Sequence, residues 1–347
     1  MLAEGVVSVR AFVPSDRVAW NSFVNEHPDG TFFHLAEWQD VLQRAFGHPT
    51  HYLLAASKSG EIRAVLPLAQ VKSLIFGNSL VSTPFCVYGG IVAVDQAAHR
   101  AIEQAACELA RRLNVDYLEM RNRRRQHPSW VCKDLYVTFR KAIDPDAEKN
   151  MLAIPRKQRA MIRKSIKEEL RAEIDDVVDR HFEIYTESLR NLGTPAFSKH
   201  YLRVLRDVFR HSCDIVTIIK GDRAVASVLN FYFREEVLPY YGGGTNEARP
   251  VAGNDFMYWT VMERAREKGC RLFDYGRSKR GTGAFEFKEH WGFIAQPLYY
   301  EYFLVRQKQM PNLSPTNPRY AKAINLWRRL PLRLTQVIGP LVAKYLG

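Results

Sequence analysis

Three kinds of feature are missing from this sequence of 347 residues: long apolar runs, paired cysteines, and the common nucleotide-binding and hydrolase motifs. No apolar segment reaches the about 20 residues that a helix needs to cross a bilayer. There is no G-x-x-x-x-G-K-[ST], no H-E-x-x-H and no G-x-S-x-G. The sequence therefore gives no support to a membrane span, a P-loop nucleotidase, a zinc protease or a serine hydrolase.

Cysteine is scarce, and the five cysteines form no C-x-x-C pair: Cys86, Cys107, Cys132, Cys213 and Cys270. Scattered cysteines in odd number are typical of reduced thiols in the cytosol rather than of disulfides or a zinc site. His48-x-x-His51 has no carboxylate or cysteine beside it, so we expect no metal site. An early apolar run with a cleavage-like end is also missing. We therefore expect no signal peptide and a cytoplasmic location.

The composition is that of a globular chain with a basic balance. Hydrophobic residues make up 46% and aromatic residues 12%, which is enough for substantial cores. The length suggests about two domains. A formal net charge of +13 favours anionic partners such as phosphates, nucleic acid or an anionic membrane surface, without choosing between them.

The chain reads as a repeated α/β unit. Each half has a hairpin, a glycine segment, a long helix and a strand, and the helices are expected near residues 96–113 and 254–268. Three pairs of landmarks lie 161, 153 and 155 residues apart: Gly60 and Gly221, Gly89 and Gly242, Glu119 and Asp274. A nearly constant offset predicts an internal duplication, although two unrelated α/β domains can share this order. We expect domains at 1–145 and 146–310 and a basic amphipathic tail at 311–347.

The richest stretch lies in the second half. A predicted strand from Leu272 delivers Asp274, Arg277 and Ser278 into a glycine-bearing loop, and a further strand is expected to present Phe287 and Lys288. This stretch predicts a binding site, whereas each of its residues taken alone is ordinary. Gly242-Gly243-Gly244 is expected between a strand and a helix, either as an anion-binding turn or as a plain tight turn.

Most of the positive charge lies between the two halves. Residues 121–171 contain fifteen Lys or Arg and six Asp or Glu. In a helix predicted over 157–170, Arg159, Arg163 and Lys167 share one face, and Ile162 and Ile166 point to another. Such a face is either simply solvated or binds a phosphate-rich ligand. The basic tail, in turn, either packs on the body as a terminal helix or lies on an anionic membrane surface.

The motifs resemble those of a known family. The tandem units, Leu192-Gly193-Thr194-Pro195, Asp274-Tyr275-Gly276-Arg277-Ser278, and Phe287-Lys288 with Trp291-Gly292 are similar to the Fem-type branch of the GNAT acyltransferase superfamily. The nearest resemblance is to the FemAB-related group that accompanies exopolysaccharide and PEP-CTERM/exosortase systems. It implies an α/β fold with mixed sheets and tandem GNAT-like domains over about residues 5–305. A long coiled-coil insertion, present in Gram-positive members, is not found.

The resemblance also implies a function. Fem-type enzymes transfer an aminoacyl group from tRNA to an amine, so we expect an acyltransferase of the cell envelope or of exopolysaccharide synthesis. The donor is expected to be aminoacyl-tRNA, acyl-CoA or an acyl carrier protein, and the acceptor an amine-bearing envelope or saccharide precursor. No tightly bound cofactor is expected. The tail predicts peripheral contact with the inner face of the cytoplasmic membrane.

Roles follow for the candidate residues. The resemblance places Lys288 in the active site, where a fixed ammonium stabilises the oxyanion of acyl transfer. Asp274 is expected to orient Arg277 or to accept a proton. The expected substrate-binding residues are Arg277, Ser278, Tyr241, Tyr275, Phe287 and Gly283, and the expected anion-binding residues are Arg159, Arg163 and Lys167. The alternative is a non-catalytic RNA- or membrane-binding protein on an acyltransferase scaffold.

Overall fold

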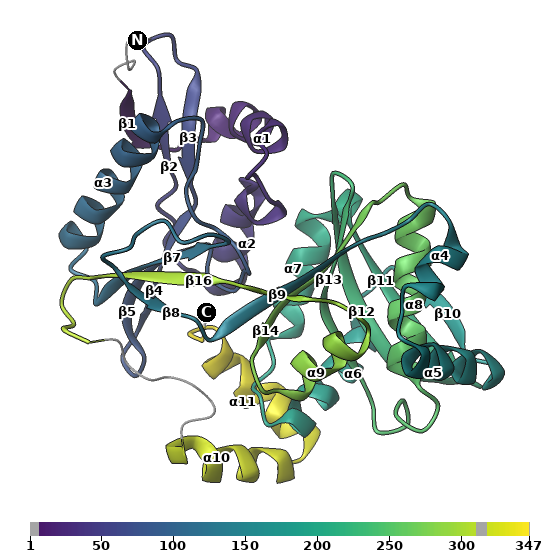
Figure 1. The fold of residues 1–347 in the computed structure, drawn as a ribbon. Coiled ribbons are helices and arrows are strands. Elements are labelled where there is room, and N and C mark those ends of the chain that lie inside the picture. Colours follow the sequence, from purple (N-terminus) through teal and green to yellow (C-terminus); the bar gives the residue numbers. More distant parts are fainter. Residues whose placement is uncertain (1–6, 310–317, 347) are drawn as a thin grey trace. The chain divides into compact units, whose positions relative to one another are not determined.

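A computed structural model of the chain describes residues 7–309 and 318–346, with side chains omitted for residues 318–322. The described residues form two compact units (Figure 1). Unit 1 contains residues 7–135, 297–309 and 345–346, and unit 2 contains residues 136–296 and 318–344. Each unit is described by itself.

Unit 1 has two sheets and three α-helices. A four-stranded sheet has the order β1-β2-β3-β6, and a five-stranded sheet has the order β4-β5-β7-β16-β8. The strands are β1 (Ser8–Ala11), β2 (Leu53–Ala56), β3 (Ile62–Leu66), β4 (Leu68–Ser73), β5 (Gly77–Ser82), β6 (Val92–Ala93), β7 (Tyr117–Asn122), β8 (Val131–Lys133) and β16 (Tyr299–Leu304). The helices are α1 (Arg17–Glu26), α2 (Glu37–Phe46) and α3 (Gln96–Arg112), with short 3₁₀ turns at Pro14–Asp16 and Phe32–His34.

Helix α3 packs against the four-stranded sheet because its sequence places small side chains on one face. Ala98, Ile102, Ala106 and Ala110 recur every fourth residue and are buried. The helix begins where the Asp95 carboxylate accepts a hydrogen bond of 2.8 Å from the backbone N–H of Ala98. It links β5 to β7, which pair in parallel. Unit 1 thus contains a strand–helix–parallel strand unit.

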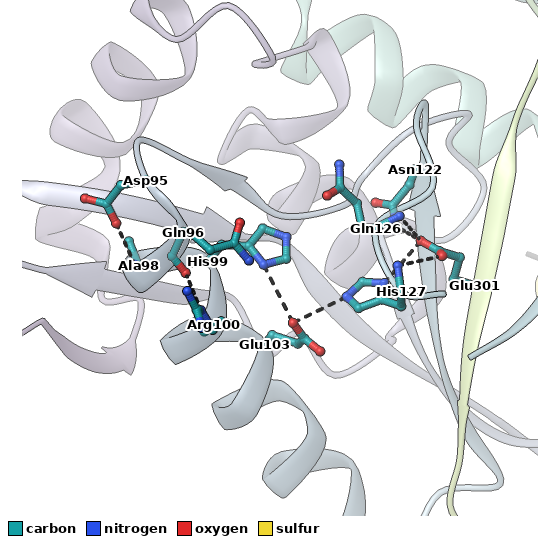
Figure 2. Close-up of polar contacts among 10 residues, drawn as sticks. All are labelled: Asp95, Gln96, Ala98, His99, Arg100, Glu103, Asn122, Gln126, His127 and Glu301. Carbon is teal, nitrogen blue, oxygen red and sulfur yellow. Dashed lines mark hydrogen bonds and ion pairs between the residues drawn. The ribbon is translucent and has the colours of Figure 1, made fainter. Parts of the chain in front are cut away.

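A buried polar cluster attaches β16 to the rest of unit 1 (Figure 2). The Glu301 carboxylate, which is fully buried, accepts hydrogen bonds from Asn122 Nδ2, from the backbone N–H groups of Gln126 and His127, and lies 3.1 Å from His127 Nδ1. On the other side, His127 Nε2 lies 3.6 Å from Glu103 of α3. The His127 ring stacks on Trp130 at 4.0 Å. The cluster therefore joins α3, the loop after β7, and β16.

Unit 2 is built on one seven-stranded sheet of order β10-β11-β12-β13-β14-β9-β15. Its strands are β9 (Tyr136–Ala142), β10 (Arg171–Ile174), β11 (Cys213–Lys220), β12 (Arg223–Phe233), β13 (Glu236–Gly244), β14 (Leu272–Lys279) and β15 (Ala295–Pro297). Its helices are α4 (Ala147–Leu152), α5 (Arg156–Lys167), α6 (Asp179–Leu192), α7 (Lys199–Val208), α8 (Gly253–Glu267), α9 (Gly283–His290), α10 (Pro318–Arg329) and α11 (Leu332–Ala343), with a 3₁₀ turn at Arg210–Ser212.

Helices cover both faces of this sheet. Val228 of β12 belongs to the core formed with Met257 and Val261 of α8. The preceding residue, Ser227, points to the other face, where its hydroxyl lies 3.0 Å from His181 Nδ1 of α6. The α8 helix links β13 to the parallel strand β14, so unit 2 contains the same strand–helix–parallel strand unit as unit 1.

Several predicted elements are confirmed, and two are wrong. The helices expected at 96–113 and 254–268 are α3 and α8. The strand expected to carry Lys288 is instead helix α9, because Thr282 caps its N-terminus and four of its residues share a helical face: Gly283, Glu286, Phe287 and His290. The Gly242–Gly244 run is not a turn but the end of β13, paired with β12. Ile162 and Ile166, expected to share a face of the helix over 157–170, differ in burial, since Ile162 is buried and Ile166 is exposed.

The predicted domains, 1–145 and 146–310, are consecutive segments, whereas each observed unit contains segments from separate parts of the chain. Strand β9 pairs with β14, which groups residues 136–142 with unit 2. Strand β16 pairs with β7 and β8, which groups residues 299–304 with unit 1. The division at 145 and 310 therefore stays a prediction, and the observed units are discontinuous in sequence.

Candidate active site in unit 2

The site begins where two parallel strands separate. Strands β13 and β14 pair at Glu236↔Leu272 and Val237↔Phe273, near the start of each strand. Beyond these pairs, β13 follows β12 as far as Gly244, and β14 follows β9 as far as Lys279. The sheet therefore opens between β13 and β14, where the residues of β13 from Tyr240 to Gly244 are half-buried and most of those of β14 are buried.

A bulge shapes β14 at the opening. The register with β9 shifts between Asp274 and Arg277, and Gly276 has a φ of 64°. Glycine adopts this left-handed conformation without a Cβ penalty. The Asp274 carboxylate holds the bulge, since its Oδ1 accepts hydrogen bonds from the Gly276 N–H at 2.8 Å and from the Thr138 hydroxyl at 3.2 Å.

Lys288 lies directly behind the bulge. Its Nζ donates to the carbonyl oxygens of Tyr275 at 2.7 Å and Gly276 at 3.3 Å, and only 8% of the residue is exposed. The ammonium also lies 5.6 Å from the Phe139 ring centre and 5.4 Å from that of Tyr275. Burial lowers the Lys288 pKa to about 7, while the charge of Asp274 opposes this shift.

Asp274 is fully buried and is part of an ion-pair network. Its Oδ2 lies 3.1 Å from Arg140 Nε, and Arg140 also pairs with Glu236 at the start of β13. The network ties β9, β13 and β14 together at the point where the last two separate. This placement fits a positioning function for Asp274 at least as well as proton transfer.

A cavity of about 600 Å³ lies on the other side of α9. Its wall is formed by the end of β13, the segment before α8 and the start of that helix, α6, α5, and the outer face of α9. The lining includes Ser188, Gly244, Asn254, Asp255, Gly283, Glu286, Phe287 and His290. This volume suits a ligand of ordinary small-molecule size. Lys288 lies on the inner face of the same helix, toward β14.

The glycines that end β13 set how closely the cavity walls approach. A Cβ on Gly243 would lie 2.5 Å from the Cβ of Ser188 on α6, and a Cβ on Gly244 would lie 2.6 Å from the Asn254 side chain at the start of α8. Glycine is therefore required here for packing between strand and helix. The sequence predicts a turn at Gly242–Gly244, whereas these glycines belong to β13.

Asp255 is a site residue that sequence reasoning missed. Its carboxylate lines the cavity in the first turn of α8, and Oδ1 accepts a hydrogen bond of 3.0 Å from Trp291 Nε1 and another from Gln158 Nε2. Burial raises the Asp255 pKa above its ordinary value, although these two donors oppose the shift. An acid at the start of a helix is ordinary in sequence, and only the fold reveals its burial.

The predicted site residues fall into several groups. Gly283 and Phe287 line the cavity, whereas Lys288, Asp274 and Tyr275 gather around the bulge. Ser278 is buried, and its hydroxyl has no hydrogen-bond partner within the described chain. The Arg277 guanidinium lies 4.7 Å from the Tyr136 ring centre, and the Tyr241 hydroxyl lies 2.8 Å from that of Tyr201.

The three predicted anion-binding residues lie on α5, which contributes to the cavity through its inner face. Gln158 bonds Asp255 and Met161 lines the cavity, while Arg163 and Lys167 are exposed and Arg159 is half-buried. Arg159 Nη1 donates to the carbonyl of Leu152 at 3.3 Å. In the parts of the chain that the structure describes, no group of three or more His, Cys, Asp or Glu side chains could hold a metal ion.

Comparison with known proteins finds one family of domains that matches part of unit 2. Residues 156–289 match the family described as an acetyltransferase (GNAT) domain, a stretch that runs from the start of α5 into α9 and contains β10 to β14. None of the curated proteins compared with the chain matches it.

Solved structures show the likeness over a longer range. FemX aligns with a TM-score of 0.66 at 13% identity, covering 86% of this chain and 98% of its own. A tandem GNAT protein from the clavulanic acid biosynthesis pathway aligns with a TM-score of 0.56 at 10% identity, covering 88% and 100%. L-PGS from Bacillus licheniformis aligns with a TM-score of 0.52 at 13% identity, covering 92% and 98%. The chain therefore has an α/β fold with mixed sheets of the tandem GNAT-like type, and its unit 2 contains the match to a GNAT acetyltransferase domain.

Proposed function

We propose that the protein is an N-acyltransferase or aminoacyltransferase that modifies an amine in cell-envelope or exopolysaccharide synthesis. The GNAT domain match and the acyltransferase folds among the similar structures support an acyltransferase. The likeness to FemX and to L-PGS favours aminoacyl transfer. Membership of the FemAB-related group linked to PEP-CTERM/exosortase systems is part of the same proposal.

The observation that carries the proposal is the opening between β13 and β14 with a cavity beside it. Strand separation leaves the end of β13 unpaired on its β14 side, and α9 presents one face to the cavity and the other to the bulge. In acyl transfer an amine attacks the carbonyl carbon, the C–N bond forms, and the bond to the leaving thiolate or hydroxyl breaks. Positioning alone supplies much of the rate of such a reaction.

The residues have distinct proposed roles. The Lys288 ammonium is the proposed source of positive charge for the oxyanion, acting from the β14 face of α9. Asp274 holds the bulge in place. Asp255 and His290 in the cavity wall are placed to bond an amine or to take its proton, and Arg277 and Ser278 remain the proposed substrate anchors. A donor held as aminoacyl-tRNA, acyl-CoA or acyl carrier protein requires no resident cofactor.

The cavity is tested by filling it. A Cβ on Gly283 would meet no atom within 4 Å, so a larger side chain can enter the open space. We expect Gly283→Trp to abolish binding of acetyl-CoA or aminoacyl-tRNA, whichever the wild type binds, while Gly283→Ala retains it. Mass spectrometry of ligands that copurify with the wild type identifies the donor class. Equal binding and transfer by Gly283→Trp and wild type would exclude the cavity from the reaction.

A second candidate function is favoured by α5. Its exposed cations present a positive face on unit 2 with few acidic neighbours in sequence, as expected for a protein that binds RNA without catalysis. Transfer of an acyl group from any donor would exclude this candidate as the full account. Binding of RNA without transfer would support it.

The finer predictions of location belong to the proposal as well. Among the described helices, none combines the length and apolar character needed to span a membrane. A cytoplasmic location with peripheral contact at the inner face of the membrane is proposed from the basic tail.

A further inference from the structure

Helix α11 buries the less apolar of its two faces. Thr335, Gly339 and Ala343 point inward, and Gln336 Nε2 donates to Glu183 Oε2 at 2.8 Å and to the Thr186 hydroxyl at 3.0 Å on α6. A helix that packs on a soluble protein usually has the opposite arrangement, with its apolar stripe inward. Leu332, Ile338 and Val342 are half-buried, so α11 packs part of its apolar surface on unit 2 and leaves a further apolar stripe exposed.

Helix α11 packs closely on unit 2. A Cβ on Gly339 would lie 3.1 Å from the backbone N and O of Ala196, so α11 approaches the segment after α6 at backbone distance. A Cβ on Gly193 would lie 2.5 Å from Ile324 of α10. Arg328 Nη2 also donates to the carbonyl of Leu192 at 3.3 Å. The described helices of the tail therefore pack on the body of the protein, as one of the two alternatives from the sequence expected. The side of α11 that faces unit 2 contains Thr335, Gln336 and Gly339.

The outer face of α11 is an exposed apolar stripe. Leu334, Val337 and Leu341 follow one another at helical spacing and are 41%, 69% and 61% exposed. Arg333 is the single charged residue in Leu332–Ala343. Contiguous exposed apolar side chains on a folded protein mark a contact surface.

The charge around the stripe identifies the kind of partner. From residue 302 to residue 347 the sequence contains eight Lys or Arg and no Asp or Glu. Arg328, Arg329 and Arg333 are exposed beside the stripe. A nucleic acid would bring phosphates against leucine and valine, and an ordinary protein surface does not supply a uniformly acidic border. An anionic bilayer supplies both negative headgroups and an apolar layer beneath them.

Unit 1 contains an independent apolar protrusion. The turn between β4 and β5 exposes Leu74 and Ile75 almost completely, beside the exposed Lys72. The ring of Phe76 in the same turn lies 6.5 Å from that of Tyr345, near the end of the described chain. Large aliphatic side chains at the tip of a hairpin have no packing function within the fold.

We propose that α11 binds the surface of an anionic lipid bilayer, with Leu334, Val337 and Leu341 entering the boundary of headgroups and acyl chains. Arg328, Arg329 and Arg333 bind the headgroup phosphates. The Leu74–Ile75 tip is an independent lipid contact of unit 1. The helix lies in the plane of the membrane surface. This function is separate from acyl transfer and is measured without any donor.

The test is co-sedimentation of the full-length protein with vesicles of equimolar phosphatidylcholine and phosphatidylglycerol, compared with vesicles of phosphatidylcholine alone. Wild type is expected to bind the anionic vesicles and to be weakened by salt. Val337→Asp with Leu341→Asp is expected to lower the partition coefficient about tenfold or more. The matched control is Val177→Asp, since Val177 is 62% exposed in the segment between β10 and α6 of unit 2.

Each outcome decides the proposal. Retained thermal melting together with lost binding in the α11 variant, and unchanged binding in the control, supports it. Absence of wild-type binding, or equal binding by all three proteins, overturns it. Dimerisation of wild type that the α11 variant abolishes, without vesicle binding, also overturns it and assigns the stripe to a second copy of the chain. Arg329→Glu with Arg333→Glu tests the electrostatic contribution and is expected to weaken binding to anionic vesicles selectively, while Arg328 keeps its contact with the carbonyl of Leu192.

Discussion

The position of Lys288 was predicted from its motif, but the secondary structure that carries it was not. The sequence suggested a lysine near the glycine-bearing loop, and the structure places its ammonium against the carbonyls of that loop. The residue reaches this position from a helix and not from a strand. The physical reason is local, because Thr282 can cap a helix and the alternation of apolar residues over 284–288 is too short to require a strand.

Replacement of Lys288 tests its proposed role. We expect Lys288→Ala to lower the turnover of acyl transfer about tenfold or more, since removal of one oxyanion-stabilising donor costs about 3 kcal/mol. Lys279→Ala, on the adjacent strand β14, is the matched control. A variant that melts like wild type and transfers as fast would remove Lys288 from the reaction.

The pH dependence of turnover distinguishes two roles for Lys288. With a pKa of about 7, the side chain loses its charge as the pH rises through that value. If the ammonium stabilises the oxyanion, turnover falls above about pH 7. If the neutral amine acts as a base, turnover rises instead. Turnover is measured against pH for wild type and for Lys288→Ala. The rise or fall near pH 7 that is lost in the variant is due to Lys288.

His127 is predicted to make stability depend on pH in unit 1. Burial opposes its protonation, but hydrogen bonds and charges from Glu103 and Glu301 outweigh burial and raise the His127 pKa to about 9. Because the folded pKa exceeds the unfolded value of about 6.5, this contribution is complete below about pH 6.5 and is lost as the pH rises through about 9. Thermal melts between these values measure it.

Removing one partner of this pair is expected to be costly. His127→Ala leaves Glu301 buried without its cation, and breaking such a pair costs about 3 to 5 kcal/mol. Replacing both residues, with Glu301→Gln in addition, is expected to recover part of the loss. The Glu301→Gln single variant completes the cycle, and additive costs of the two substitutions would show that the two side chains do not interact.

At the scale of elements, the order of helices and strands was largely predictable and the function of the glycines was not. The spacing of Ala98, Ile102, Ala106 and Ala110 determines α3 because a single helix face suffices. Gly242–Gly244 carries no such local signal, since the need for glycine comes from Ser188 and Asn254, which are distant in sequence. Asp255 was missed for the same reason.

The contact of Gly243 with α6 leads to a prediction for this pair of elements. Gly243→Ala is expected to destabilise the protein by about 1 to 3 kcal/mol, because the new Cβ would overlap Ser188. In a Ser188→Gly background the same substitution should cost less. Denaturant melts of the four proteins give the coupling energy, and an unchanged cost in both backgrounds would contradict the observed packing.

At the scale of the whole molecule, the net charge of +13 follows from the sequence alone, whereas the positions of the charged side chains depend on the fold. If RNA binds along α5, replacing Arg159, Arg163 and Lys167 by alanine is expected to reduce the slope of log K against log salt by about 2 to 3. Filter binding at several salt concentrations measures this slope. Alanine at Arg171, Lys220 and Arg223 removes the same charge elsewhere, and an equal effect of both sets would indicate non-specific attraction.

The chain returns to unit 1 at β16, and this return affects the order in which the two sheets can fold during synthesis. Strand β16 lies between β7 and β8 in the five-stranded sheet, although unit 2 is encoded almost entirely before it. The ribosome therefore completes the seven-stranded sheet of unit 2 while the five-stranded sheet of unit 1 still lacks an inner strand. Domains usually complete folding in the order of their synthesis. Here the sheet that begins nearer the N-terminus is completed after the sheet of unit 2, and a fragment ending at residue 135 lacks the strand that Glu301 anchors.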